Sequence, residues 1–454
     1  MVVSVVGSVL VTLVGVLTVF LASPGPVGTW LALVLTGLLA GAIAARSDLV
    51  WSAILGTVAG SGAAWWLAAL GTSRSFWWLG VAIALVLVTG GFMVGTSIGW
   101  RRDPGATATA SWRRTPRPGR IAAIAVASIG IVAVGMYTGY VAVEGSSQFT
   151  AARDAHVDCR TPTFAYGWPY EAVNYDRSAD ATLEPVQVQA DRGSEWDCSR
   201  PGAPAGDEVV SSDGIRLAAW YVPGVHVGPT GPTVVIVPGF AADKSDILRY
   251  APAFHDSFNV VLMDVRNVGQ SQRSDTTLGL YEQRDVRAIV DWLERAKHPA
   301  WVALVGNSMG GATSLAEAVT DTRIRALILD SMHASLVVSL GNILETEHGH
   351  PSLPGSWAIA AAVSGRVGGD VTSIDPVSMI TRVGARPVLL THGSADAVDV
   401  PVESAQRNLG AAMAAGVPVA LHYCPGATHG HVIDVCPAEW ARWTTSFLEG
   451  AMAR

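Results

Sequence analysis

Charged residues are scarce in this sequence, above all near its N-terminus. Only 15% of the 454 residues are charged, and the first 100 residues contain just three charges, Arg46, Asp48 and Arg74. An ordinary globular domain is roughly 25% charged. So few charges exclude a water-soluble globule for that part of the chain. The formal net charge of −7 also argues against nucleic-acid binding, which calls for a basic domain.

Long apolar runs take the place of the missing charges. They cover residues 1–22, 27–45, 49–70, 76–99 and about 121–143. Each run approaches or exceeds the ~20 residues that a helix needs to cross a bilayer, and the first lacks the basic start of a secretory signal peptide. The sequence therefore predicts an α-helical transmembrane domain of about five spans over residues 1–145. No span has a charge in its interior, which argues against a transporter.

The distribution of arginine predicts how the spans are oriented. The loop between the fourth and fifth spans carries six arginines and one acidic residue. Because basic loops stay in the cytoplasm, we expect a cytoplasmic N-terminus and an extracytoplasmic C-terminal part in a multi-pass protein of the cell membrane. Residues 1–150 have a net charge of +5 and residues 151–454 of −12, which marks the same boundary.

Cysteine is absent before residue 159. The four cysteines follow the last expected span, and an even number on the outer side of a membrane suits disulfides. Three pairings are possible. We favour Cys159–Cys198 together with Cys424–Cys436, which would clamp a loop around His429, and free buried thiols remain the alternative. No two cysteines have the close spacing of a zinc site.

The sequence pattern changes near residue 206. Residues 146–205 have little periodicity and many turn formers, and they are predicted to be an extracytoplasmic connector. Beyond them, short apolar runs alternate with helical patterns. These runs are residues 215–222, 233–237, 260–263, 302–305, 324–329, 387–391 and 417–422. Such runs are typical of strands buried on both faces, so residues 206–454 are predicted to form a mostly parallel, doubly wound α/β sheet.

The strongest motif is Gly306-Asn307-Ser308-Met309-Gly310, which fits the pattern G-x-S-x-G. It lies between an expected strand and an expected helix, as a nucleophile elbow does. The turn is so tight that Gly306 and Gly310 must be small. A serine hydroxyl also needs a base and an acid to become a nucleophile. Asp396 and His429 each follow one of the last two expected strands.

Several ordered motifs in residues 207–449 resemble those of α/β-hydrolase serine hydrolases of the esterase, lipase and acyl-peptidase kind. They read S-S-D-G-I-R-L, V-P-G-F, D-V-R-N-V-G-Q-S, G-N-S-M-G-G, H-G-S-A-D and G-A-T-H-G. The resemblance implies a Ser308 nucleophile, an Asp396 acid and a His429 base. It further implies an oxyanion hole from the backbone N–H groups of Phe240 and Met309, a helical lid over about residues 332–385, and no cofactor.

The sequence departs from the family at Pro238, where His is usual before Gly239. The segment after Asp396 is one residue longer than expected, which makes Asp399 an alternative acid. Asp330, after an earlier strand, is a second alternative acid.

The sequence offers other histidines near His429 and in the expected lid. His431 is an alternative base. The segment 345–350 contains two His and two Glu, a conceivable metal site that we interpret as a solvated loop, so no metal site is predicted.

These features predict a membrane-anchored, extracytoplasmic serine hydrolase that cleaves an ester, thioester or amide through an acyl-enzyme. The expected partners are an acyl-bearing small molecule or lipid as substrate and the lipid bilayer, without nucleic acid and with no protein partner specified. One alternative is an acyltransferase on envelope lipids or glycans. Another is a non-catalytic membrane scaffold whose hydrolase-like domain binds without catalysis.

Overall fold

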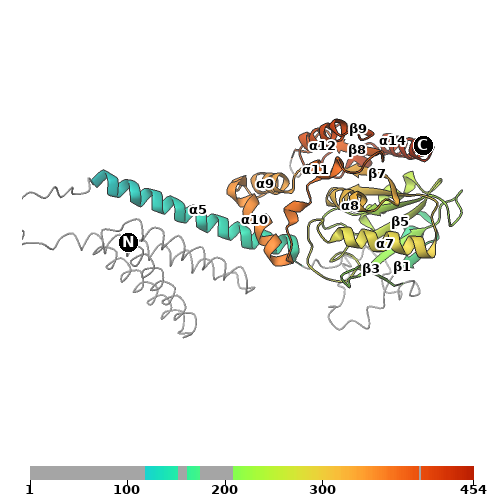
Figure 1. Cartoon of the computed structure of the whole chain (residues 1–454), viewed down its shortest axis with the longest axis horizontal. Helices are drawn as coiled ribbons and strands as arrows, with labels where there is room; N and C mark the ends of the chain where they lie inside the picture. The colour runs from blue at the N-terminus through green and yellow to red at the C-terminus, as the bar shows by residue number, and fades with distance from the viewer. Residues whose placement is uncertain (1–117, 152–160, 174–207, 398–399, 454) are drawn as a thin grey trace, which may run out of the picture. The chain divides into compact units, whose positions relative to one another are not determined.

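The structure is a computed structural model that describes residues 118–151, 161–173, 208–397 and 400–453 (Figure 1). The chain divides into two compact units, residues 1–144 and 145–454. The first four expected membrane spans lie outside the described residues, and the fifth falls within helix α5 (Pro118–Thr150), whose side chains are described from residue 134 onward. Within the described ranges, no helix combines the length and the apolarity that crossing a membrane demands.

The second unit is built on a nine-stranded sheet. The strands run in the order β1-β3-β5-β4-β6-β7-β8-β9, with β2 paired to β3. Their bounds are β1 Glu171–Val173, β2 Val209–Val210, β3 Arg216–Val222, β4 Thr233–Val237, β5 Asn259–Asp264, β6 Val302–Asn307, β7 Ile324–Asp330, β8 Val388–Gly393 and β9 Val419–Cys424. Pairs that involve β3 are antiparallel, and all pairs from β5 to β9 are parallel. The mostly parallel sheet predicted from the apolar runs is therefore confirmed.

The connections between the strands are mainly helical. The helices are α6 Pro162–Tyr166, η2 Asp246–Ala253, α7 Glu282–Ala296, α8 Met309–Thr320, α9 Leu336–Thr346, α10 Ser352–Val367, η3 Val371–Ser373, α11 Pro376–Ile380, α12 Val402–Ala414, α13 Val432–Val435 and α14 Pro437–Met452. Four of them, α9, α10, η3 and α11, lie between β7 and β8, in the segment expected to form a lid.

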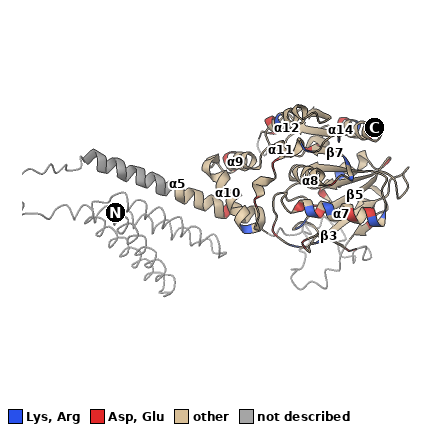
Figure 2. Ribbon diagram, viewed as in Figure 1, with Lys and Arg blue, Asp and Glu red and all other residues tan. Residues whose placement is uncertain are grey.

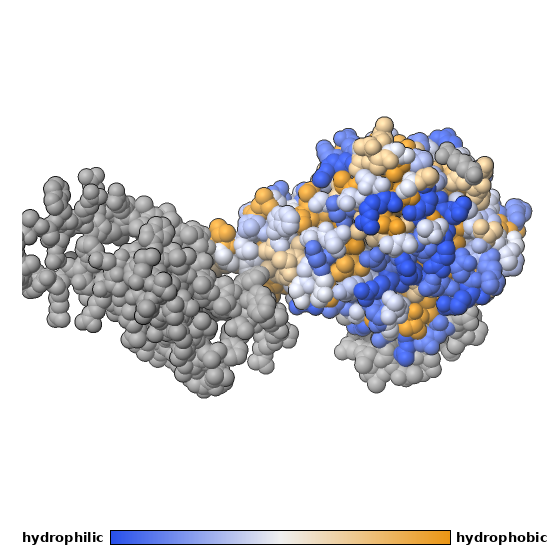
Figure 3. All heavy atoms as spheres, viewed as in Figure 1, coloured by the Kyte–Doolittle hydropathy of each residue, from blue (hydrophilic) through white to orange (hydrophobic). Residues whose placement is uncertain are grey.

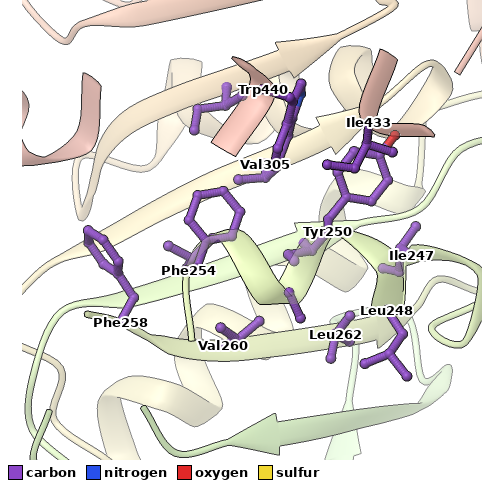
Figure 4. Packing of buried hydrophobic residues seen from close by; sticks show 14 of the residues in the cluster. Ile247, Leu248, Tyr250, Phe254, Phe258, Val260, Leu262, Val305, Ile433 and Trp440 are labelled. Atoms are coloured by element: carbon purple, nitrogen blue, oxygen red, sulfur yellow. The ribbon is translucent and has the colours of Figure 1, made fainter. Parts of the chain in front are cut away.

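One face of the sheet packs against η2 and α14. Alternate residues of each strand point to the same face, and Val260, Leu262 and Val305 are buried in one cluster with the aromatic side chains of these two helices (Figure 4). The indole of Trp440 lies 5.0 Å from the ring of Tyr250, centroid to centroid. Edge-to-face aromatic pairs of this kind stabilise a core beyond the area they bury.

Helix α7 shows how an amphipathic sequence is placed at the surface. Its apolar side chains Val286, Ile289 and Leu293 are spaced by three or four residues and are all buried. Arginine and acidic residues occur along the rest of the helix (Figure 2), and the surface around it is largely hydrophilic (Figure 3). The helix begins at Glu282 and ends at Ala296.

The segment 146–205, predicted to be a connector, contributes to the sheet. Strand β1 pairs antiparallel with β3, and Glu171 lies opposite Tyr221. A three-residue strand in a segment without periodicity gives no sequence signal, because its pairing partner is far away in the chain. Local structure is expected in this connector, but the pairing of β1 with the sheet was not among the predictions.

Candidate active site

Ser308 occupies the turn between β6 and α8. Its backbone has φ 52° and ψ −118°, a conformation that non-glycine residues rarely adopt. The turn lifts the side chain out of the strand and places it at the first turn of a helix, whose unpaired N–H groups favour negative charge. Strain of this kind persists where the surrounding structure holds it, and it concentrates at functional sites.

The turn leaves no room for a side chain at either glycine of the motif. A Cβ on Gly306 would lie 2.3 Å from the carbonyl oxygen of Gly310, and a Cβ on Gly310 would lie 2.4 Å from the carbonyl oxygen of Pro238. Both distances are far below van der Waals contact and involve rigid backbone. The turn that carries Ser308 can therefore form only with glycine at these positions.

The structure brings Ser308, His429 and Asp396 together, although they are separated by 33 or more residues in the chain. Nε2 of His429 lies 2.8 Å from Oγ of Ser308. Nδ1 of the same ring lies 2.8 Å from Oδ2 of Asp396. A carboxylate only accepts hydrogen bonds, so Nδ1 carries the proton and Nε2 is left to accept the proton of the serine hydroxyl.

Hydrogen bonds on the side away from His429 fix the carboxylate of Asp396. Its other oxygen, Oδ1, accepts a hydrogen bond of 3.2 Å from the N–H of Val400. The buried imidazole of His392 donates from Nε2 to the carbonyl of Val400 at 2.9 Å. Burial lowers the pKa of His392, so this ring is neutral near pH 7. His392 thus anchors the loop that presents the carboxylate.

A disulfide encloses the loop that carries His429. Cys424 at the end of β9 is bonded to Cys436 at the start of α14. This pairing was predicted, and it is confirmed. The other expected pair, Cys159–Cys198, lies outside the described residues. Nη2 of Arg249 donates to the carbonyl of Gly430 at 3.0 Å and ties the same loop to η2.

The predicted oxyanion residues lie on two segments that touch each other. Met309 is the first residue of α8, so its N–H has no partner within the helix. Phe240 lies in the loop that follows β4. This loop contacts the turn of Ser308, since a Cβ on Gly239 would lie 3.4 Å from Cβ of Ser308. Pro238, the departure from the family pattern, faces Gly310 through its carbonyl oxygen.

Asp330, an alternative acid, is held by donors other than His429. Its carboxylate accepts hydrogen bonds from Tyr250 Oη at 2.9 Å, Asn307 Nδ2 at 3.1 Å and Thr391 Oγ1 at 2.8 Å. Burial raises the pKa of Asp330, and the three donors oppose that shift. This buried network braces Asn307, the residue directly before Ser308. Sequence reasoning missed the roles of Tyr250 and Asn307, because a lone tyrosine or asparagine gives no signal of its own.

The remaining candidates are not brought to Ser308. His431 is exposed, and its Nδ1 lies 2.7 Å from Asp434 Oδ2. Asp399 lies outside the described residues. In the part of the chain that the structure describes, no group of three or more His, Cys, Asp or Glu side chains could hold a metal ion, the segment 345–350 included.

Comparisons with known proteins bear on the fold. A family model described as "alpha/beta hydrolase fold" matches residues 232–359. The YqkD protein of Bacillus subtilis is 30% identical over 192 residues, which are 41% of this chain and 62% of that protein. The YfhR protein of Escherichia coli K12 is 28% identical over 214 residues, which are 44% of this chain and 65% of that protein.

The chain thus spans less than two thirds of the length of these two relatives. Among solved structures, an esterase of Pyrococcus furiosus is similar with a TM-score of 0.48 and 19% identity, over 66% of this chain and 97% of that one. The family model matches residues 232–359, and the mostly parallel sheet of the C-terminal part fits the α/β-hydrolase fold that the sequence predicts.

Proposed function

We propose that the second unit is a serine hydrolase that cleaves an ester, thioester or amide through an acyl-enzyme. The observation that carries the proposal is the pair of 2.8 Å contacts that link Ser308 to His429 and His429 to Asp396. Three polar side chains from separate loops meet at the carboxyl ends of parallel strands, where ligands collect in open α/β sheets.

The geometry supports a two-stage reaction. His429 takes the proton from Ser308 as Oγ attacks the substrate carbonyl, and Asp396 stabilises the imidazolium that forms. The N–H groups of Met309 and Phe240 would face the developing oxyanion, each contributing ~3 kcal/mol. His429 then protonates the leaving group, and a water molecule activated by the same ring releases the acyl group from Ser308.

We further propose that the domain is exported and held at the membrane by residues 1–145. The arginine distribution and the uncharged runs support this placement. The Cys424–Cys436 disulfide supports an oxidising compartment. A membrane-held site fits a substrate that is an acyl-bearing small molecule or a lipid.

Turnover tests the chemistry. The full-length protein in detergent should hydrolyse p-nitrophenyl butyrate, and Ser308→Ala should abolish the activity while leaving the melting temperature within a few degrees. His431→Gln is the matched control for His429→Gln, since it removes an exposed imidazole two residues away. Equal activity of wild type and Ser308→Ala would refute the proposal.

Cysteine labelling tests the placement. Glu449→Cys in α14, an exposed position, should react with a membrane-impermeant maleimide in intact cells. Thr107→Cys in the arginine-rich loop should react only after lysis. The reverse pattern would refute export.

A further inference from the structure

The last turn of α5, residues 145–150, packs against the loop that would form half of the oxyanion hole. The ring centroid of Phe149 lies 5.2 Å from that of Phe240, with the planes inclined at 49°. Phe240 directly follows Pro238 and Gly239, whose backbone is in close contact with Gly310 and Ser308. A chain of direct contacts therefore runs from Phe149, through this loop, to the turn that carries the nucleophile.

The loop has a backbone conformation that needs support. Ala241, the neighbour of Phe240, has φ 65°, in the left-handed region that residues with a Cβ rarely occupy. Such a conformation is kept only when the surrounding structure holds it. The direction of the Phe240 N–H depends on this same stretch of backbone, so what packs on the Phe240 ring bears on the oxyanion hole.

Two side chains from other elements anchor the end of α5. Nη1 of Arg366 in α10 donates to Oγ1 of the buried Thr150 at 2.7 Å. Nδ2 of Asn267, in the loop after β5, donates to the carbonyl of Ala151 at 2.9 Å. The two residues that follow Phe149 are thus both fixed, which limits the movement of its ring.

We propose that Phe149 is a positioning residue for the oxyanion hole. Its ring holds the Phe240 side chain and, through it, the N–H that faces the developing charge. This inference rests on the proposed function. Its consequence is that the active site extends beyond the hydrolase-like segment 206–454: a residue at the end of α5 completes it.

Steady-state kinetics of the full-length protein with p-nitrophenyl butyrate provide the test. Loss of one oxyanion donor costs roughly 100-fold or more in kcat, so Phe149→Ala, which only misplaces a donor, should lower kcat about 10-fold while KM changes less than about threefold. Phe149→Tyr returns a ring and should restore kcat. The matched control is Tyr166→Ala, which breaks another ring pair, the Tyr166–Trp168 stack of 4.4 Å, and should keep wild-type kcat.

A double variant separates positioning from general stability. If Phe149 acts through Phe240, the double variant Phe149→Ala with Phe240→Ala should have the same kcat as Phe240→Ala alone. Three results would each overturn the inference. They are a double variant whose loss of kcat is the product of the two single losses, a kcat of Phe149→Ala within twofold of wild type, and a Phe149→Tyr variant whose kcat is not restored. If turnover requires Ser308 but Phe149→Ala has wild-type kcat, only this inference is overturned. If turnover does not require Ser308, the proposed function is overturned, and this inference falls as well.

Discussion

Asp396 and His429 are joined by a contact of 2.8 Å between Oδ2 and Nδ1, and the aspartate side chain has no exposed surface. A buried carboxylate at this distance fixes both the tautomer and the direction of the imidazole. This contact distinguishes Asp396 from Asp330, which the sequence left as an alternative acid. The carboxylate of Asp330 instead accepts hydrogen bonds from Tyr250, Asn307 and Thr391.

Asp396→Asn is expected to lower kcat roughly 10³- to 10⁴-fold, because the amide N–H₂ can donate to Nδ1 and stabilise the wrong tautomer. Asp330→Asn should reduce kcat far less, since it disturbs only the support of Asn307. Rates of p-nitrophenyl butyrate hydrolysis measure both. An Asp330→Asn defect as large as that of Asp396→Asn would contradict the assignment of the acid.

Gly310→Ala should prevent the elbow from forming, because its Cβ would lie 2.4 Å from the backbone oxygens of Val237 and Pro238. We expect a loss of several kcal/mol in the free energy of unfolding, of the order that severe overpacking produces. Gly410→Ala is the matched control. Gly410 lies inside α12 with nothing within 4 Å of its added Cβ, so this change should be neutral or stabilise by up to about 1 kcal/mol. Equal melting temperatures for the two variants would contradict the steric argument.

Removal of the Cys424–Cys436 disulfide should destabilise the loop of His429. The bond closes a sequence separation of 12 residues, for which the chain-entropy estimate is about 3 kcal/mol. The double variant Cys424→Ala with Cys436→Ala should therefore melt at a lower temperature and lose activity at temperatures where the wild type is active. A variant as stable and active as the wild type would show that the loop does not need the bond.

Stability should fall in acid partly through His333. This imidazole is buried, and Nε2 has no hydrogen-bond partner in the described part of the chain. Burial, with a smaller contribution from His429, lowers the pKa of His333 to about 4. Below pH ~6.5 the imidazole of His333 is protonated in the unfolded chain but stays neutral in the folded protein. The stability present above that pH is therefore lost progressively towards pH 4.

The measurement for His333 is the melting temperature from pH 7 to pH 4. His333→Gln removes the titrating group, so the fall in melting temperature across this range should be smaller than in the wild type. His431→Gln removes an exposed imidazole instead and should leave the fall unchanged. Parallel curves for wild type and His333→Gln would contradict the assignment.

Local patterns predicted most of the sheet and the residues that meet at Ser308. Buried parallel strands give near-continuous apolar runs, as in Thr233–Val237, and a tight turn after such a run demands glycine, as at Gly306 and Gly310. Contacts between distant segments left no such pattern. The pairing of β1 with β3 and the packing of Phe149 on Phe240 depend on tertiary neighbours.

Which aspartate serves as the acid depends on the direction of its carboxylate as well as on its position in the sheet. Asp330 is the last residue of β7 and Asp396 follows β8, so both reach the same edge of the sheet. Which carboxylate faces His429 depends on where the loop after β9 folds back, and that path is set by the Cys424–Cys436 bond and the Arg249 contact to Gly430.

The most direct test of the central claim is the site of covalent modification by a fluorophosphonate. The full-length protein should gain one phosphonyl group, and peptide mass spectrometry should locate it on Ser308. Ser308→Ala should remain unmodified, and Asp396→Asn should react much more slowly than the wild type. Modification of another residue, or equal labelling of wild type and Ser308→Ala, would contradict the account.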